Sequence, residues 1–345
     1  MFPENGGVDQ PIDVIAERFG RFARDEAPGR SELYAQWAAG IAADAEVQAV
    51  LARIPARHRQ PPLVFAVTRL LGSGEPDFPG WREWMLAHAD EVVAECGRRS
   101  LQTNEPLRCA ALLPALSRIE GPIALLEVGA SAGLCLYPDR YSYRYTGAAG
   151  TIALDPASGP SRVVLDCEVR GERMPAIALP DIVWRAGIDL DPLDAASPDT
   201  AAWLEGLVWP GETGRAARVR SALAIAADDP PLMVAGDGID RLAEVAASAP
   251  VGATLVIQTP GVLAHIPWAG RRTVIETARA AGRWITIDAP ALHDGWTEPI
   301  DLDAWPGGFA VALDGRVQAA ADPLGGWWRL HDSPASRPGA AAARG

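Results

Sequence analysis

The stretch that decides the fold is Pro122–Leu136, which reads P-I-A-L-L-E-V-G-A-S-A-G-L-C-L. It begins with an apolar run typical of a buried strand, and this run carries an acid, Glu127. Three small residues, Gly129, Ser131 and Gly133, then mark a loop, and the apolar residues after them look like a helix start. In open α/β sheets such a loop lies outside the carboxyl end of its strand, where the backbone can touch a ligand. We therefore predict a ligand site at this loop.

Strand-like and helix-like segments alternate after this stretch. Apolar strand-like runs lie at 182–188, 231–235, 254–258 and 284–288, and helix-like segments lie between them at 199–227, 239–247 and 271–281. Two final strand-like runs, 308–313 and 316–321, flank Asp314-Gly315, a strong signal for a two-residue hairpin. Alternation of this kind predicts a parallel sheet with helices on both faces, joined by right-handed crossovers. With an antiparallel last strand, we expect an α/β fold with a doubly wound, seven-stranded, mostly parallel sheet.

The residues before this sheet predict a separate helical domain. No strand pattern is present before residue 122. Helical periodicity or helix-start signals mark 12–22, 31–41, 63–71, 81–96 and 103–106. We therefore expect an all-helical N-terminal domain at 1–118 and an α/β domain at 119–332.

Two segments depart from this organisation. Between about 137 and 180, short strand-like runs lie among Gly, Pro and Ser turns, and Tyr141, Tyr143 and Tyr145 alternate as strand residues facing one way do. We interpret this segment as a β insertion in the α/β domain. From 333 to 345 the chain is rich in Pro, Ala, Gly and Arg, which is typical of a disordered tail.

The charge of the chain narrows its partners. Its 345 residues carry a net charge of −13, which disfavours nonspecific binding to nucleic acid. All 31 basic residues are arginines. The absence of lysine excludes Schiff-base chemistry, pyridoxal-phosphate attachment and a phosphate-loop lysine.

The sequence indicates no membrane-spanning segment. No apolar run approaches the ~20 residues of a membrane-spanning helix, and the polar, acidic start of the chain does not resemble a signal peptide. We therefore expect a cytoplasmic protein without a membrane partner.

The four cysteines and five histidines show no metal-binding or redox spacing, so we predict buried free thiols and no metal site.

Four features of the chain resemble class I S-adenosylmethionine-dependent methyltransferases. The run E-x-G-x-S-x-G at 127–133 resembles their first motif, with Ser131 where glycine is usual. G-I-D at 187–189 resembles the second motif, G-D-G at 236–238 resembles the third, and the terminal hairpin resembles the last two strands of that fold. The resemblance covers roughly 120–330. It implies a methyltransferase-like Rossmann fold, S-adenosylmethionine as the cofactor, and a small-molecule or protein methyl acceptor.

The whole chain is also similar to a bacterial family, the domain of unknown function 2332 family. This resemblance rests on T-N-E at 103–105, on the stretch 125–134 and on G-I-D-L-D-P-L-D at 187–194. It implies the fold more than any reaction, because no substrate comes with it.

The methyltransferase resemblance assigns cofactor contacts to residues around the loop. Gly129 and Gly133 would let the backbone approach the cofactor closely, because they lack a Cβ. Asp189, at a strand end, would take both ribose hydroxyls, Asp237 would lie by the adenine amine, and Glu127 would anchor the loop or the methionine amine. The expected cofactor-binding residues are Glu127, Gly129, Ala130, Ser131, Gly133, Asp189, Asp237 and Gly238.

Asp155 is a second candidate for the ribose contact. It also ends a strand-like run and lies 22 residues after Gly133, close to the usual acidic spacing. We favour Asp189 because a helix and another strand follow it, but the sequence leaves both open. Asp189 and Asp237 are also compatible with plain turns or helix caps.

No catalytic residue is recognisable, but five residues are candidates for facing a substrate. Gln258 and Thr259 end the fourth strand, where substrate contacts are expected in this fold, and His265 follows as a candidate base. Asn104 and Glu105 would reach over the site from the helical domain, or would simply cap a helix.

Three other functions compete with a methyltransferase. G-A-S-A-G at 129–133 matches the nucleophile elbow of α/β-hydrolases, with Ser131 as nucleophile and with Asp237 or Asp288 and His293 completing a triad. That elbow normally follows several strands, and no strand is predicted before this loop. A nicotinamide-binding loop needs glycine at the position of Ser131. The third is a non-catalytic protein that retains the methyltransferase-like fold.

Overall fold

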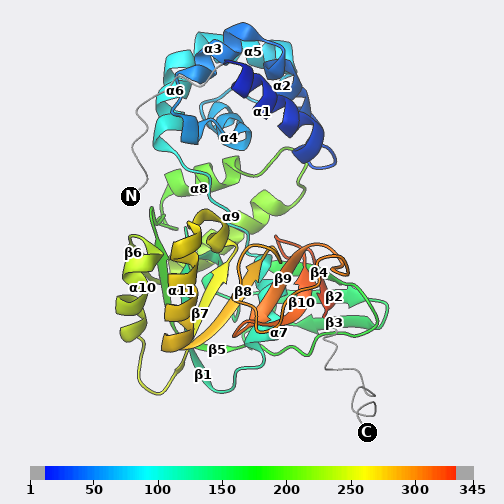
Figure 1. The fold of residues 1–345 in the computed structure, drawn as a ribbon, viewed down its shortest axis with the longest axis vertical. Helices are drawn as coiled ribbons and strands as arrows, with labels where there is room; N and C mark the ends of the chain where they lie inside the picture. The colour runs from blue at the N-terminus through cyan, green and yellow to red at the C-terminus, as the bar shows by residue number, and fades with distance from the viewer. Residues whose placement is uncertain (1–11, 332–345) are drawn as a thin grey trace. The chain divides into compact units, whose positions relative to one another are not determined.

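The computed structural model describes residues 12–331, so the tail predicted at 333–345 lies outside the described residues. The chain divides into two compact units (Figure 1). Among the described residues, the first unit comprises 12–103 together with 197–217, and the second comprises 104–196 together with 218–331. This division differs from the predicted domain boundary at 118/119.

The difference has a packing cause. Helix α7 (Arg108–Leu116) packs against strands of the second unit, although it precedes the first strand in sequence. Helix α8 (Pro198–Gly206) packs against α4 (Pro61–Leu70) in the first unit, although it follows several strands. Each unit is therefore built from two separate stretches of chain.

The first unit is helical throughout its described residues. It contains α1 (Ile12–Arg21), a π-helical turn (Phe22–Glu26), α2 (Glu32–Ala42), α3 (Ala45–Ala52), a 3₁₀ turn (Ala56–His58), α4, α5 (Phe78–Ala87), α6 (Ala89–Arg98) and α8. The ring of Phe65 packs against Tyr34 and Trp37, with centroids 4.7 Å and 5.5 Å away. The helical pattern over 81–96 is divided between α5 and α6, which meet at His88.

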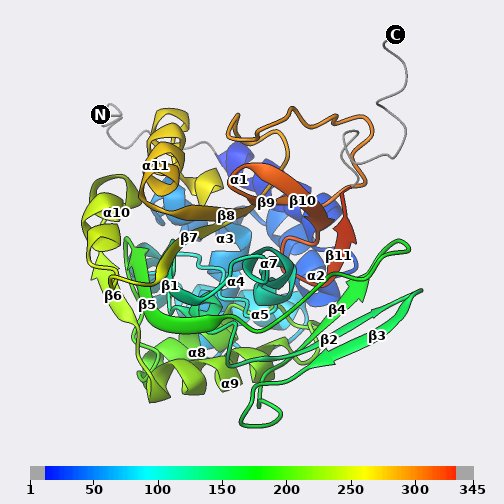
Figure 2. The ribbon, with the colours of Figure 1, turned by 90° about the horizontal axis from the view of Figure 1, so that it is seen from below.

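The second unit is built on one mostly parallel sheet (Figure 2). Its strands are β1 (Pro122–Val128), β2 (Ser142–Gly147), β3 (Gly150–Leu154), β4 (Val164–Val169), β5 (Asp181–Asp189), β6 (Leu232–Ala235), β7 (Thr254–Pro260), β8 (Arg283–Asp288), β9 (Phe309–Leu313), β10 (Arg316–Ala321) and β11 (Trp327–Leu330). The remaining helices are α9 (Arg215–Asp228), α10 (Gly238–Ala247) and α11 (Trp268–Ala281), with 3₁₀ turns η3 (Leu134–Leu136) and η4 (Val262–His265).

The parallel half of the sheet has the order β6-β5-β1-β7-β8, and all five of these strands were predicted from the sequence. The strands that follow β1 in this half, β5 and β6, lie on one side of it. β7 lies on the other side, and the chain continues from it through α11 to β8. The chain therefore adds strands on one side of β1 first and on its other side from β7 onward, so the direction of strand addition reverses between β1 and β7.

The predicted count of seven strands is wrong, because the sheet has 11 strands. The predicted β insertion forms, as β2, β3 and β4, and these strands extend the same sheet. The strand that connects it is β11, which pairs antiparallel with β10 and parallel with β4. An exposed edge at β10 would leave backbone groups unpaired, and β11 covers it.

The antiparallel part of the sheet begins earlier than expected. β9 is antiparallel to both β8 and β10, so the antiparallel strand next to the parallel half is not the last one. The turn between β9 and β10 was predicted correctly. Asp314 and Gly315 both have positive φ, +54° and +80°, which matches the two-residue turn that suits twisted strands.

Within residues 12–331, no helix is both long and apolar enough to span a membrane.

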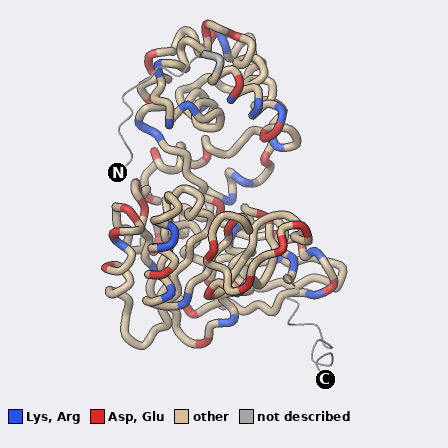
Figure 3. Tube along the Cα trace, viewed as in Figure 1, with Lys and Arg blue, Asp and Glu red and all other residues tan. Residues whose placement is uncertain are grey.

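Basic and acidic residues are interspersed along both units (Figure 3). The net charge of −13 is therefore not confined to one segment.

The hairpin turn gives a test of the sheet. A Cβ on Gly315 would lie 1.9 Å from Arg279 Nη2 and 2.4 Å from the Gly295 carbonyl oxygen. We expect Gly315→Ala to lower the free energy of unfolding by ~3 kcal/mol, because it adds this clash to an unfavourable φ. Gly307→Ala is the control. Gly307 has φ of +91°, and among the described residues no atom lies within 4 Å of a Cβ added there, so a loss of only ~1 kcal/mol is expected. Equal losses in urea unfolding would contradict this account.

Candidate functional site

The loop after β1 is held in an unusual backbone conformation. Gly129, Ser131 and Gly133 have φ of +77°, +52° and +73°. The amides of Gly129 and Ala130 both donate to the Ile188 carbonyl oxygen, at 2.8 Å and 3.2 Å. The loop is therefore folded back onto the end of the neighbouring strand β5.

Asp189 fixes the middle of this loop. Its Oδ2 accepts a hydrogen bond from the Ser131 amide at 2.7 Å, and its Oδ1 accepts one from the Asp191 amide at 2.9 Å. The side chain is half-buried, so it is bound to the loop on one side and open on another. Both carboxylate oxygens keep further capacity to accept hydrogen bonds.

Asn104 holds the same loop from the segment before α7. Its Nδ2 donates to Ser131 Oγ at 2.7 Å, and its Oδ1 accepts from the Ala132 amide at 3.1 Å. A residue with a Cβ in the left-handed region costs ~1–2 kcal/mol, so serine at position 131 needs a compensating contact. The hydroxyl of Ser131 provides it, which explains why a side chain is tolerated there.

Glu127 and Gln258 form a buried polar pair at the point where strand addition reverses. They are direct partners in the parallel register of β1 and β7, and both are buried. Gln258 Nε2 donates to Glu127 Oε2 at 3.2 Å and to the Cys135 carbonyl oxygen at 3.0 Å. Within residues 12–331, Gln258 Oε1 is buried without a hydrogen-bond partner. One buried acceptor of the pair is therefore left unpaired, which is rare in a folded protein.

Burial raises the pKa of the Glu127 carboxyl well above its usual range. The negative charge that Cys135 and Asp189 can carry acts in the same direction, whereas the bond from Gln258 and the charge of Arg108 lower the pKa. Arg108 was not singled out in the sequence, because a lone arginine at a helix start carries no signal. Its Nη1 donates to the Pro260 carbonyl oxygen at 2.9 Å, so it also holds the end of β7.

The other expected cofactor residues lie around the same edge. Asp237 is exposed and caps α10, with its Oδ1 accepting from the Ile239 amide at 2.9 Å. A Cβ on the buried Gly238 would lie 2.6 Å from Val128 Cγ1, so this glycine lets α10 approach β1. The residues Glu127 to Gly133, Asp189, Asp237 and Gly238 follow or end β1, β5 and β6, which are adjacent parallel strands. The carboxyl ends of these strands therefore lie at the same end of the sheet.

Asp155 is not part of this group. It follows β3, which is the edge strand farthest from β6 in the strand order. Its carboxylate accepts a hydrogen bond from Arg144 at 2.9 Å. Of the two acids that the sequence left open, only Asp189 contacts the glycine loop.

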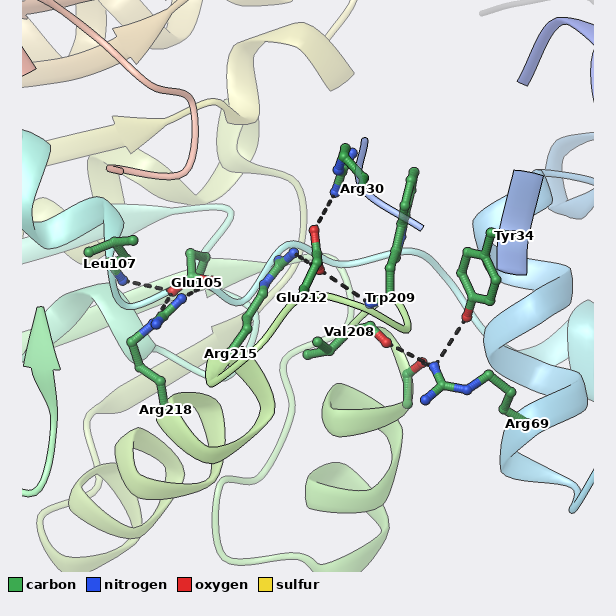
Figure 4. Close-up of polar contacts among 11 residues, drawn as sticks. Arg30, Tyr34, Arg69, Glu105, Leu107, Val208, Trp209, Glu212, Arg215 and Arg218 are labelled. Carbon is green, nitrogen blue, oxygen red and sulfur yellow. Dashed lines mark hydrogen bonds and ion pairs between the residues drawn. The ribbon is translucent and has the colours of Figure 1, made fainter. Parts of the chain in front are cut away.

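The residues expected to face a substrate are mostly engaged within the fold. Buried Glu105 pairs with Arg218, whose Nε and Nη2 lie 2.8 Å and 3.2 Å from its two oxygens, and it accepts from the Leu107 amide at 3.0 Å (Figure 4). Buried Thr259 shares a hydrogen bond with Thr286 at 2.8 Å. His265, at the end of η4, is exposed.

The loop geometry also tests the fit of a nucleoside cofactor. A Cβ on Gly129 would lie 2.4 Å from Val262 Cγ2, so this glycine makes room for a protein side chain. The half-buried carboxylate of Asp189 and the unsatisfied Gln258 Oε1 are the groups that fit hydroxyl and amine donors. These hydrogen-bond acceptors therefore suit a polar ligand with hydroxyls and a positive charge.

A hydrolase triad does not fit the contacts. His293 Nδ1 accepts from the Gly295 amide at 3.1 Å, and its Nε2 lies 3.5 Å from Asp288 Oδ2. Both ring nitrogens are thus directed at partners other than Ser131, whose Oγ accepts from Asn104. Of the two acids considered for such a triad, Asp288 lies beside His293, but no contact joins His293 to Ser131 among the described residues.

Comparisons with known proteins identify the family of the chain, but they indicate no reaction. A family described as "Uncharacterized protein conserved in bacteria (DUF2332)" matches residues 16–329, and the chain belongs to this family. Neither a curated protein nor a solved structure matches the chain. In the part of the chain that the structure describes, no group of three or more His, Cys, Asp or Glu side chains is arranged to hold a metal ion.

The contacts of Asn104 predict a stability effect. Asn104→Ala removes two hydrogen bonds to buried partners, so we expect the free energy of unfolding to fall by ~2 kcal/mol. Ser131→Gly is the matched variant: it loses the bond to Asn104 but relieves the left-handed strain, and a change within ~1 kcal/mol is expected. A loss for Ser131→Gly as large as that for Asn104→Ala in urea unfolding would contradict the role assigned to the hydroxyl.

The raised pKa of Glu127 predicts a pH effect. Between the ordinary value of 4.5 and the raised value in the fold, the folded chain keeps a proton that the unfolded chain loses. The contribution of Glu127 to stability is therefore fully present below pH 4.5 and is lost as the pH rises through the folded pKa. Urea unfolding across this pH range should show the wild type losing stability relative to Glu127→Gln as pH rises. Parallel profiles would show that Glu127 ionises normally.

Proposed function

We propose that this member of the DUF2332 family binds S-adenosylmethionine at the carboxyl ends of β1, β5 and β7 and transfers its methyl group to a small-molecule or protein acceptor. One observation carries the proposal. The glycine loop follows β1 where the direction of strand addition reverses, and Asp189 from the adjacent strand is bonded to the Ser131 amide at 2.7 Å. Ligands of open α/β sheets bind outside the carboxyl ends of the strands at such a reversal.

Asp189 is the proposed ribose ligand. Each of its oxygens already accepts one backbone N–H, from Ser131 and Asp191. These bonds fix the orientation of the carboxylate and leave lone pairs for two neighbouring hydroxyls. Ligand binding would then cost little reorganisation of this side chain, because the fold has oriented it beforehand.

Glu127 and Gln258 are proposed to receive the cationic end of the cofactor. An ammonium group supplies the donor that Gln258 Oε1 lacks among the described residues. A cation beside Glu127 also favours the ionised carboxylate, which opposes the effect of burial on its pKa. The net charge of −13 of the whole chain suits a cationic ligand for the same reason.

Asp237 and Gly238 are proposed to border the adenine. One oxygen of Asp237 caps α10, and the exposed carboxylate keeps its second oxygen for an exocyclic amine. Gly129, Ala130 and Gly133 would lie beside the cofactor through their backbone, although the space at the Gly129 Cα is already taken by Val262.

Bound S-adenosylmethionine supplies an electrophilic methyl group. The contribution of the chain is to align the acceptor and to exclude water, because methyl transfer is a displacement. Among the five substrate-facing candidates, His265 alone has an exposed side chain, so it is the proposed proton acceptor.

A second candidate function is supported by the other four residues. Asn104, Glu105, Gln258 and Thr259 are buried and hydrogen-bonded within the fold. Side chains engaged in this way favour a protein that keeps the ligand site without catalysing methyl transfer.

Titration calorimetry with S-adenosylmethionine and S-adenosylhomocysteine tests the ligand. We expect Asp189→Asn to weaken binding by ~10-fold or more, because a carboxylate loses bonds to two hydroxyls. Asp155→Asn is the matched control at the opposite edge of the sheet and should bind as the wild type does. The absence of heat with millimolar ligand and folded protein, or equal losses for the two variants, would refute the proposal.

Binding and catalysis are then separated by one further measurement. Wild-type protein with bound cofactor should transfer labelled methyl groups to an acceptor in a bacterial extract, and His265→Ala should reduce this transfer without changing the affinity for the cofactor. Binding without transfer would favour the non-catalytic candidate.

A further inference from the structure

Two of the four cysteines lie together beside the glycine loop. Cys109 belongs to α7 and Cys135 to η3, two residues after Gly133. Cys109 Sγ donates to the Cys135 carbonyl oxygen at 3.7 Å, so the thiol on α7 contacts the residue that carries the second thiol. Cys135 Sγ lies 3.6 Å from the Glu105 carbonyl oxygen. Both thiols are therefore held in place in the reduced protein, within reach of each other.

The two thiols differ in their readiness to react. Burial raises the pKa of the Cys109 thiol, whereas the hydrogen bond from Cys109 and then the charge of Arg108 lower the pKa of the Cys135 thiol. Cys135 is 7% exposed and Cys109 is 1% exposed. Cys135 is the more exposed of the two thiols, so a small oxidant reaches it first, and Cys109 is placed to attack the oxidised Cys135 sulfur afterwards.

The remaining cysteines provide an internal comparison. Cys96 and Cys167 are both buried, and burial raises the pKa of each to about 12. Neither of these two pKa values is shifted by a second cysteine. They therefore lack the partner and the lowered pKa that mark Cys135.

We propose that Cys109 and Cys135 form a redox modification site, in which a small hydroperoxide converts the two thiols into a disulfide that ties α7 to the end of the glycine loop. The oxidant is small because the pair is buried. The site does not depend on the proposed methyltransferase activity.

The reaction balances with the peroxide as oxidant. The Cys135 thiolate attacks one peroxide oxygen, the O–O bond breaks, and the leaving alkoxide or hydroxide takes up a proton. This gives a sulfenic acid on Cys135. The Cys109 sulfur then attacks the Cys135 sulfur, an S–S bond forms, the S–O bond breaks, and hydroxide leaves as water with the Cys109 proton. The thiols lose two electrons, and the peroxide gains them.

The disulfide would constrain the segment that carries the candidate site. The closed loop from Cys109 to Cys135 contains all of β1 and the turn from Gly129 to Gly133. Oxidation also removes both S–H donors, so the Glu105 carbonyl oxygen loses its contact with Cys135. The expected consequence is a stiffer turn, because a cross-link limits the motion of the residues it encloses.

The test uses full-length Cys96→Ser/Cys167→Ser protein, which keeps only the proposed pair. After brief treatment with hydrogen peroxide, we expect the intact mass to fall by two hydrogen atoms and both free thiols to disappear. Cleavage after arginine should then release 109–118 linked to 119–140, and dithiothreitol should separate the two peptides. Slower amide hydrogen exchange at 129–136 in the oxidised protein should accompany the link.

Wild-type protein gives the same readout if the double variant folds poorly, because Cys96 and Cys167 fall in other peptides, 83–98 and 163–170. Cys109→Ser should retain an oxidised Cys135 without forming the linked peptides. The proposal fails if both thiols of the pair stay reduced, if Cys135 passes to sulfinic acid in the wild type, or if the disulfide joins two chains. None of these outcomes depends on binding of S-adenosylmethionine, so they do not bear on the proposed function.

Discussion

The hydrogen bond from the Ser131 amide to the Asp189 carboxylate is the contact on which the candidate site depends. It joins the ends of β1 and β5, which are parallel neighbours, and it holds Ser131 at φ of +52°. Asn104 completes the arrangement by binding the Ser131 hydroxyl and the next amide. Because left-handed geometry at a residue with a Cβ is unfavourable, the loop needs partners of this kind. Its shape is therefore set by the fold before any ligand arrives.

A second constraint comes from the acid inside β1. β1 is paired on both sides, and Gln258 is the neighbour that donates a hydrogen bond to the Glu127 carboxyl. A buried carboxylate with few partners is costly, and the raised pKa of Glu127 expresses that cost. A site that disfavours its own negative charge is one that a cationic ligand improves. The unfavourable placement of Glu127 therefore supports the proposal that a cationic ligand binds beside it.

The sequence was sufficient where the fold is local. Buried strands followed by helices predicted the five parallel strands, and Asp314-Gly315 predicted the hairpin, because each pattern lies within a short stretch. It was insufficient where pairing joins distant segments. Trp327–Leu330 is too short to show a strand pattern, yet it links the insertion to the sheet through β4. The sequence left Asn104 open between capping a helix and reaching over the site, and it could not indicate the partner, Ser131, which lies 27 residues away.

The same distinction applies to function. Binding of a nucleoside needs a fixed turn, an oriented carboxylate and free acceptors, and these follow from backbone geometry around Ser131, Asp189 and Gln258. Catalysis of methyl transfer would also need an aligned acceptor, and Thr259 at the end of β7 is already bonded to Thr286. The same turn is followed within two residues by Cys135, whose carbonyl oxygen accepts a hydrogen bond from the Cys109 thiol. Any chemistry at that thiol would act on the rigidity of the turn, and hence on the property that the candidate site requires most.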